Sequence, residues 1–253
     1  MASSSSFPRS GAEPRHIVWD WNGTLLDDFS ICVAAADRAS RLAVGVGVSD
    51  NAYRKHFTRP IRTFYERLAA RPVSDSEWRL IVQEYHSCYA ELLETAVLRT
   101  GALAALECAG RQGMTQSLLS MAGHDQLVRL VRRHGLDRYF LVVDGSNGEA
   151  RTASKRDMLV SHLRSVQRRC GTELAPHAVL LVGDTLDDAV AAAAVGARCA
   201  LLADGSLDVD AAAACGYHLV PCLLSAVNLG FDRPDPELPT SAVAVKALRA
   251  RGH

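Results

Sequence analysis

Short apolar runs alternate with amphipathic stretches along much of this chain. Residues 16–21 form an apolar run that predicts a buried strand, and Asn22-Gly23 at its end predicts a sharp turn. The second half of the chain predicts further buried strands at residues 116–121, 140–143, 179–182, 199–202 and 218–220. Helical patterns lie between these strands at residues 102–112, 125–134, 155–168 and 186–195. Alternation of this kind predicts an α/β fold with a parallel sheet and right-handed crossovers.

The stretch after the first strand has a different pattern, with helical spacing and no convincing strand. Helices are predicted at residues 31–42, at residues 61–68 and at residues 78–93, the last after the capping sequence Ser74-Asp75-Ser76-Glu77. We therefore expect an all-helical domain to be inserted into an α/β core. The expected divisions are a lead-in 1–13, a core 14–29 and 98–230, a helical insert 30–97 and a tail 231–253.

The ends of the chain carry weaker patterns. The lead-in is rich in serine and has no apolar core of the kind a signal peptide needs, so we expect it to be disordered. The tail contains several prolines, with one short helix expected at residues 242–250.

Composition narrows the classes of partner. The chain has 253 residues and 48% hydrophobic content, and 28 Lys and Arg balance 28 Asp and Glu. A net charge of zero gives no electrostatic reason to expect nucleic acid or an anionic membrane as a partner, and no apolar run is long enough to span a bilayer. The oligomeric state is not predictable from these features.

Seven cysteines are scattered along the chain without a C-x-x-C pair or a histidine spacing typical of zinc sites. Most of them lie in apolar surroundings. Reduced thiols in the protein core and a cytoplasmic location are the favoured interpretation, while a zinc site or a disulfide is the less favoured alternative.

Polar residues follow three of the predicted strands. Asp20 ends the first strand, Ser120 ends the second and Asp184 follows the run 179–182, while Lys155 opens a predicted helix. Open α/β sheets bind ligands at the carboxyl ends of their strands. Asp20 is therefore a candidate nucleophile or metal ligand, although a strand-ending aspartate can also cap the next turn.

The ordered set Asp20, Ser120, Lys155 and Asp184-x-x-x-Asp188 resembles the four motifs of the haloacid dehalogenase superfamily, which consists mostly of phosphatases. The resemblance implies a Rossmann-like core. It also implies that the helical insert is a C1 cap, as in the phosphoglycolate-phosphatase-like members, which closes over the site and selects substrates. The expected function is hydrolysis of a small phosphorylated metabolite, with Asp20 attacking phosphorus to form an aspartyl-phosphate.

The same resemblance implies a Mg²⁺ site, and a hard divalent cation prefers oxygen ligands. Asp20, Asp184 and the backbone carbonyl of Asn22 are the expected ligands, with Asp188 holding metal-bound water. Asp187 is the less favoured neighbour, because adjacent side chains on a helix diverge. A second interpretation is that Asp187 and Asp188 only complement the helix dipole.

Phosphate binding is expected from Ser120 and Lys155, through a hydroxyl donor and a point charge. Gly23 and Thr24 are expected to add a backbone N–H and a hydroxyl. Lys155 is one of three lysines in an arginine-rich chain, which favours a specific role over a solvated surface position. His124 is more consistent with a capping or surface role than with the site.

Asn22 is the main departure from the family pattern, because the phosphatases usually carry a second aspartate at this place. That residue protonates the leaving oxygen and activates water, and an amide cannot exchange a proton at neutral pH. General acid–base catalysis contributes roughly 10²–10⁴-fold, so Asn22→Asp is expected to raise the rate on poor leaving groups if nothing replaces the missing acid.

Two alternatives remain open. The sequence Asp20-Trp21-Asn22-Gly23-Thr24 is also similar to the phosphonatase branch of the superfamily, which would require Lys55 as a Schiff-base lysine. The other alternative is a catalytically impaired phosphate-binding protein with the same fold. Lys55 belongs to a group of positively charged or titratable residues in the helical insert, which could meet an anionic substrate or form a solvated face: Lys55, His56, Arg59 and Arg62.

Overall fold

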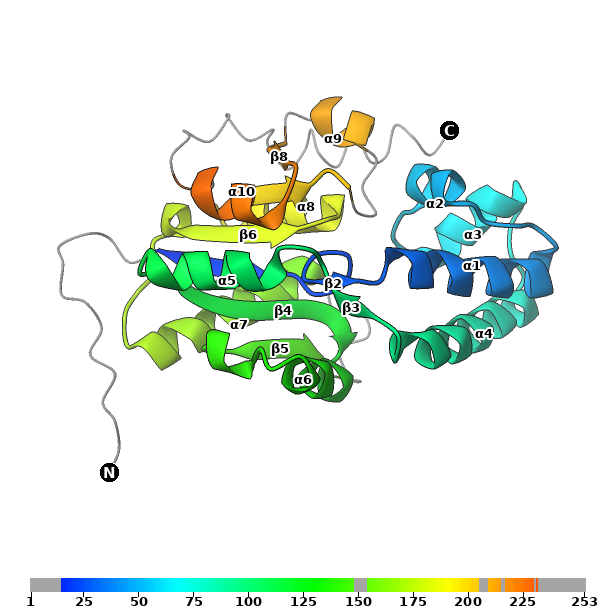
Figure 1. Cartoon of the computed structure of the whole chain (residues 1–253). Helices are drawn as coiled ribbons and strands as arrows, with labels where there is room; N and C mark the ends of the chain where they lie inside the picture. The colour runs from blue at the N-terminus through cyan, green and yellow to red at the C-terminus, as the bar shows by residue number, and fades with distance from the viewer. Residues whose placement is uncertain (1–14, 148–153, 205–208, 215–216, 230, 232–253) are drawn as a thin grey trace.

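A parallel six-stranded sheet lies at the centre of the larger part of the molecule (Figure 1). The structure is a computed structural model that describes residues 15–147, 154–204, 209–214, 217–229 and 231. The strands follow the order β5-β4-β1-β6-β7-β8, which places the first strand of the chain in the middle of the sheet. Their bounds are β1 His16–Trp19, β4 Thr115–Gly123, β5 Val143–Ser146, β6 Val179–Gly183, β7 Arg198–Leu202 and β8 Leu219–Val220.

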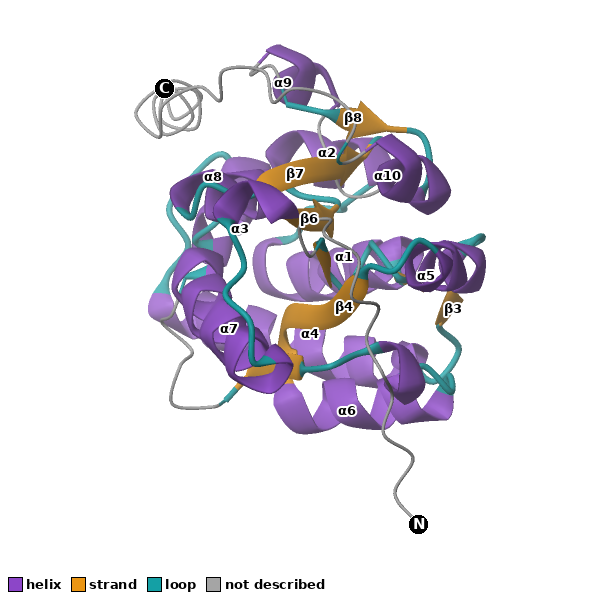
Figure 2. Ribbon diagram, turned by 90° about the vertical axis from the view of Figure 1, so that its left-hand side faces the viewer, coloured by secondary structure: helices purple, strands orange, loops and turns teal. Residues whose placement is uncertain are grey.

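Helices cover both faces of this sheet, as Figure 2 shows. Alternate residues of β1 point to opposite faces, so Ile17 and Trp19 pack with α5, α6 and α10, whereas Val18 packs with α7 and α8. The bounds of the helices in this part are α5 Ala102–Arg111, α6 His124–Arg133, α7 Lys155–Cys170, α8 Leu186–Ala194, α9 Val209–Ala214 and α10 Leu223–Leu229. Burial on both faces explains why the strands are continuous apolar runs.

A second, all-helical part follows β1 and lies to the right in Figure 1. Its helices are α1 Phe29–Val44, α2 Asp50–His56, α3 Ile61–Ala69 and α4 Asp75–Leu93. They enclose their own apolar core, in which Phe64, Tyr65 and Ile81 are almost fully buried. The predicted start of α4 is confirmed, because Ser74 and Glu77 form a reciprocal capping box there. We call this part the cap.

Two short strands join the cap to the sheet domain. β2 (Leu26–Asp27) and β3 (Val97–Leu98) pair antiparallel at the two crossings of the chain, in the register Leu26 to Leu98. Neither strand was predicted, because two residues are too few to produce a periodic pattern. The α/β class, the parallel sheet and the helical cap are confirmed.

Several predicted elements differ from the structure in extent. The strand predicted at 140–143 is found at Val143–Ser146, and a 3-10 helix (Asp137–Tyr139) ends just before the predicted residues. The first strand ends at Trp19, and α10 was not predicted. The expected lead-in 1–13 and the expected helix 242–250 lie outside the described residues. Within the described residues, no helix combines the length and the apolar character needed to cross a membrane.

A chain of buried polar side chains fixes α7 against the sheet. His162 of α7 contacts Asp144 through Nδ1 at 2.7 Å and Ser117 through Nε2 at 2.7 Å, and Ser117 contacts His16 at 2.8 Å. Burial and the neighbouring His162 lower the pKa of His16 to about 3, so its ring stays neutral. The serine, histidine and aspartate resemble a hydrolase triad, but Ser117 and His162 are closed off from solvent. Their consequence is structural: they hold the helix that begins at Lys155.

Candidate active site

Adjacent strands bring two of the predicted carboxylates together. β1 and β6 pair in parallel with Trp19 opposite Val182, and the backbone N–H of Asp20 donates to the carbonyl of Val182 at 2.9 Å. Asp20 and Asp184 therefore leave the sheet side by side at its carboxyl edge. Both are buried, which the sequence could indicate only by their place at strand ends.

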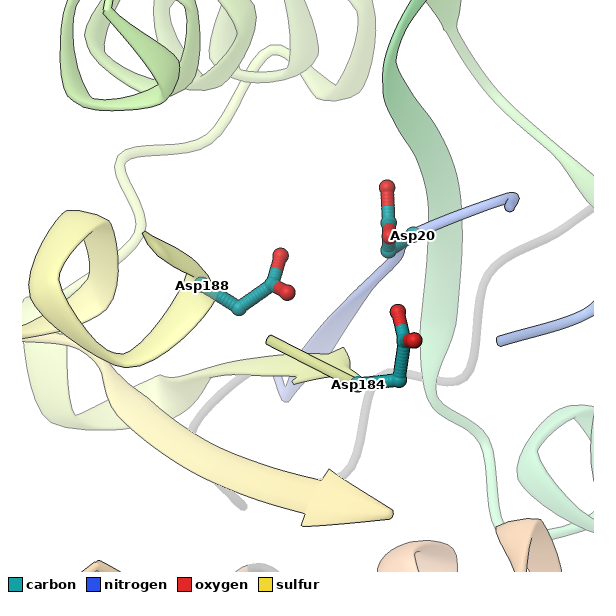
Figure 3. Close-up of side chains that lie close together, drawn as sticks. All are labelled: Asp20, Asp184 and Asp188. Atoms are coloured by element: carbon teal, nitrogen blue, oxygen red, sulfur yellow. The ribbon is translucent and has the colours of Figure 1, made fainter. Parts of the chain in front are cut away.

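Asp188 joins them from the first turn of α8. Its Oδ2 accepts hydrogen bonds from the backbone and the hydroxyl of Thr185, at 3.0 and 2.7 Å. One carboxylate oxygen from each of Asp20, Asp184 and Asp188 lies within 4.8 Å of the others. Figure 3 shows these three side chains gathered around one small space. Asp188 therefore both caps its helix and belongs to the carboxylate group, so the two interpretations of this residue are compatible.

Lys155 supplies a positive charge to this group. Its helix begins at a capping box formed by Ser154 and Asp157, and its Nζ lies 2.8 Å from Oδ1 of Asp20 and also pairs with Asp188. Burial lowers the pKa of Lys155, but the two carboxylates outweigh this effect and raise the pKa above its ordinary value. The ammonium group therefore stays charged although the residue is buried.

One ammonium group does not balance three buried carboxylates. Burial raises the pKa of Asp20 to about 8, with Asp188 and Asp184 adding to the increase and Lys155 opposing it. A divalent cation bound beside these carboxylates would lower this pKa and favour the ionised form that a nucleophile requires. Convergent carboxylate oxygens are the ligands that Mg²⁺ prefers, so this donor set fits that ion.

The loop after Asp20 approaches Asp184 closely. Gly23 has a φ of 70°, and a Cβ at this position would overlap the Asp184 carboxylate, so only glycine fits. The hydroxyl of Thr24 donates to Asp184 Oδ1 at 3.3 Å and does not face open space. Arg99, which sequence reasoning missed, holds the loop by donating to the carbonyls of Gly23 and Thr24 at 2.6 and 3.0 Å.

Ser120 lies beside Asn22. The regular pairing between β4 and β5 ends at Leu119, and the Ser120 hydroxyl donates to Asn22 Oδ1 at 3.2 Å. The same hydroxyl accepts from the backbone N–H of Ala122 at 3.1 Å. The structure thus brings the Ser120 side chain to the loop that follows Asp20.

The amide of Asn22 is held by two residues that sequence reasoning missed. Its Nδ2 donates to Asp28 Oδ2 and to the Tyr89 hydroxyl, each at 2.7 Å. Tyr89 comes from cap helix α4 and also donates to Asp28 at 2.6 Å. Asp28 is only 1% exposed and accepts the backbone N–H of Gly23 at 2.7 Å, so this N–H is not free for phosphate here. The carboxylate of Asp28 therefore lies beside Asn22. In the family pattern, the carboxylate belongs to residue 22 itself.

A sequence signal for these residues was weak. The pair Asp27-Asp28 ends the apolar run after Thr24, but nothing in the sequence shows that Asp27 is exposed and Asp28 is buried. Tyr89 lies near the C-terminal end of the amphipathic helix α4, where an aromatic residue is expected for packing alone.

The remaining candidates divide between the site and the cap. His124 accepts the backbone N–H of Gly145 through Nδ1 at 3.3 Å, which agrees with the preferred structural role. Lys55 is exposed on α2, and Arg62 is paired with Asp75 inside the cap at 2.9 Å. Asp187 does not join the carboxylate group; it pairs with Arg59 of the cap at 2.7 Å.

Two proteins named phosphoglycolate phosphatase are similar to this chain. The first, from Pseudomonas fluorescens, is 26% identical over 200 residues, which cover 77% of this chain and 71% of that protein. The second, phosphoglycolate phosphatase 1 from Pseudomonas aeruginosa, is 27% identical over 199 residues, covering 76% and 70%.

Solved structures share the fold. A haloacid dehalogenase-like hydrolase from Streptococcus pneumoniae superimposes with a TM-score of 0.68 at 21% identity, covering 85% of this chain and 97% of that one. A haloacid dehalogenase-like hydrolase from Bacteroides fragilis gives 0.69 at 20% identity, covering 84% and 99%. The model of the haloacid dehalogenase-like hydrolases matches residues 14–196, most of the chain. The arrangement of the sheet, the cap and the buried carboxylates accords with that match, and the chain belongs to the haloacid dehalogenase-like hydrolase family.

Proposed function

We propose that this enzyme is a Mg²⁺-dependent phosphatase that hydrolyses a small phosphorylated metabolite through an aspartyl-phosphate on Asp20. The observation that carries the proposal is the buried group of Asp20, Asp184 and Asp188. Lys155 forms ion pairs with two of its members, Asp20 and Asp188. A nucleophile, a charge for the transferring phosphoryl group and a set of oxygen ligands are then present at one sheet edge.

Each side chain has a distinct part in this scheme. Asp20 attacks phosphorus, the P–O ester bond breaks as the leaving oxygen takes a proton from solvent water, and a second water then cleaves the aspartyl-phosphate, which restores the Asp20 carboxylate and releases phosphate. Lys155 and Ser120 bind the phosphoryl oxygens and stabilise the charge that develops on them. Mg²⁺, when bound by Asp20, Asp184 and the backbone carbonyl of Asn22, with Asp188 nearby, offsets the repulsion between the two anions.

The two similar phosphoglycolate phosphatases support a phosphate monoester as substrate. The cap supports a small one, because its helices cover the carboxyl edge of the sheet and Arg59 pairs directly with Asp187 beside the site. We propose residues 30–97 as the substrate-selecting domain and residues 14–29 with 98–230 as the catalytic domain.

A reducing compartment is part of the same proposal. The six described cysteines are free thiols, and burial raises the pKa of Cys199 well above its ordinary value, which keeps that thiol unreactive. We propose that the enzyme works in the cytoplasm, where phosphorylated metabolites and reduced thiols occur together.

Removal of divalent cations is expected to stop the reaction. Three buried carboxylates would repel a phosphate dianion if only Lys155 opposed them, so chelation should slow hydrolysis by about 100-fold or more. The measurement is phosphate release from a panel of phosphorylated metabolites, in EDTA and after addition of excess Mg²⁺. Full activity in chelated buffer would contradict the metal requirement, and no hydrolysis of any ester with Mg²⁺ would favour the impaired phosphate-binding alternative.

Substitution of Lys55 separates the phosphatase from the phosphonatase alternative. Lys55 is exposed, so Lys55→Ala should leave hydrolysis of phosphate esters within about twofold of the parent, as surface substitutions usually do. The check is steady-state hydrolysis together with borohydride treatment in the presence of an aldehyde phosphonate. Covalent trapping of the phosphonate on the parent but not on the variant would replace the phosphatase by a C–P hydrolase.

A further inference from the structure

One arginine reaches from the cap to the catalytic domain. Arg59 lies in the segment between α2 and α3, and its Nε is 2.7 Å from Oδ2 of Asp187 in α8. The two side chains are 43% and 33% exposed, so the ion pair can be reached from solvent. Such a partly exposed pair contributes little stability by itself.

The pair lies at the rim of the carboxylate group. Asp187 and Asp188 are neighbours on α8, and their side chains diverge: Asp188 turns to Lys155, whereas Asp187 turns to Arg59. Lys155 in turn pairs with Asp20 at 2.8 Å. The guanidinium group of Arg59 therefore brings a positive charge of the cap to the helix turn that carries Asp188.

Two other cationic candidates, Lys155 and Arg62, have charged partners of their own. Lys155 is bound between Asp20 and Asp188, and Arg62 is held inside the cap by Asp75. Arg59 uses its Nε for Asp187, while a guanidinium group carries four further N–H donors on its terminal nitrogens. A fork of this shape binds carboxylates and phosphates in bidentate fashion.

The partner of Arg59 is poorly suited to a permanent pair. The two side chains are joined by one partly exposed ion pair, and Asp187 is followed in α8 by a second carboxylate, Asp188. An anionic group of a ligand could therefore take over the guanidinium group from Asp187.

We propose that Arg59 binds a second anionic group of the substrate, a carboxylate or another phosphate, and that Asp187 occupies the guanidinium group while no substrate is bound. This inference rests on the proposed function and adds to it a substrate class. The substrate is a phosphate monoester with a further negative charge a short distance from the phosphate. Arg59 is then a specificity-determining residue of the cap.

The test uses phosphate esters on one two-carbon frame that differ in charge. Phosphoglycolate and ethylene glycol bisphosphate carry a second anion, 2-hydroxyethyl phosphate is neutral at that end, and phosphoethanolamine is positive. In the parent protein with Mg²⁺, KM should be lowest for an anionic member. The lower KM of the two anionic esters identifies whether a carboxylate or a phosphate is recognised.

Arg59→Gln should raise the KM for the preferred anionic ester by about 10- to 100-fold, the usual worth of hydrogen bonds to a charged group. The KM for 2-hydroxyethyl phosphate should stay within about threefold, and kcat should change little, because uniform binding is lost and not transition-state stabilisation. Unchanged thermal unfolding of the variant excludes a general loss of structure.

Two variants serve as controls. Lys55→Gln removes a cap cation that is exposed on α2, and it should leave the charge preference intact. Asp187→Asn removes the carboxylate that competes with the substrate for Arg59 and that repels an anionic ester. This variant should therefore have a lower KM for the anionic esters.

Binding distinguishes this inference from the proposed function. Calorimetric titration of the same esters into Asp20→Asn with Mg²⁺ needs no turnover. If the variant binds the anionic esters more tightly but the parent hydrolyses none of them, the role of Arg59 stands and the proposed phosphatase activity is wrong. Hydrolysis with equal KM for the anionic and neutral esters, or a preference that survives Arg59→Gln, would overturn the inference alone. If no ester binds or reacts, both are wrong.

Discussion

Asp20→Asn is expected to lower phosphatase turnover by at least about 10⁴-fold, as the loss of a nucleophile does in other hydrolases. The amide has nearly the same shape as the carboxylate but cannot attack phosphorus, and it is a weaker ligand for a hard cation. Its oxygen can still accept from Lys155 Nζ, which lies 2.8 Å from Oδ1 in the parent. The variant should therefore stay folded.

Steady-state phosphate release and thermal unfolding measure both parts of this expectation. The aspartyl-phosphate should be trapped on the parent and be absent from the variant. A matched control is Asp27→Asn, which changes an exposed carboxylate of the same segment and should keep the parent rate. Turnover of Asp20→Asn within a few-fold of the parent would remove the catalytic assignment as a whole.

The second large effect is expected from exchanging residues 22 and 28. The sequence alone favours Asn22→Asp as an activating change, but the structure alters this expectation. Asn22 Nδ2 donates to Asp28 Oδ2 at 2.7 Å, so a carboxylate at residue 22 would face another carboxylate in a buried position. The single variant should lose about 1–3 kcal/mol of stability and slow every substrate, because a buried hydrogen bond becomes a repulsion.

The double variant Asn22→Asp with Asp28→Asn keeps the charge and the hydrogen bonds. The amide at residue 28 can donate to the new carboxylate at residue 22 and accept from the N–H of Gly23. The Tyr89 hydroxyl, which donates to Asp28 in the parent, can then donate to the carboxylate at residue 22. A carboxylate then stands where the family's phosphatases have one. The rate on alkyl phosphates should rise, with an upper limit of about 10²–10⁴-fold, and the rate on aryl phosphates should rise less.

Leaving-group dependence is the measurement that decides this prediction. In the parent, the rate should fall steeply as the pKa of the leaving alcohol rises, and in the double variant it should fall less steeply. Asp28→Asn alone is the control for the loss of the buried charge. If the single Asn22→Asp variant is faster than the double variant, the contact with Asp28 does not govern the site.

The sequence by itself determined the α/β class, the helical cap and the residues that gather at the sheet edge. Continuous apolar runs bounded by turn residues are typical of strands that are buried on both faces, and the carboxyl ends of parallel strands lie at one edge. Asp20, Asp184 and Asp188 could therefore be selected from their places after apolar runs, and Lys155 from its place at a helix start. Their catalytic roles stay predictions.

Only the tertiary structure decided which strand lies next to which, and which distant side chains complete the site. β1 lies between β4 and β6, an order that depends on pairing His16 with residues as distant as Thr115 and Val179 and leaves no local pattern. The contacts of Asn22 with Tyr89, and of Arg59 with Asp187, likewise join the cap to the sheet domain. Periodicity reports whether a side chain is buried but not which residue it meets, because the partner is fixed by the packing of the whole chain.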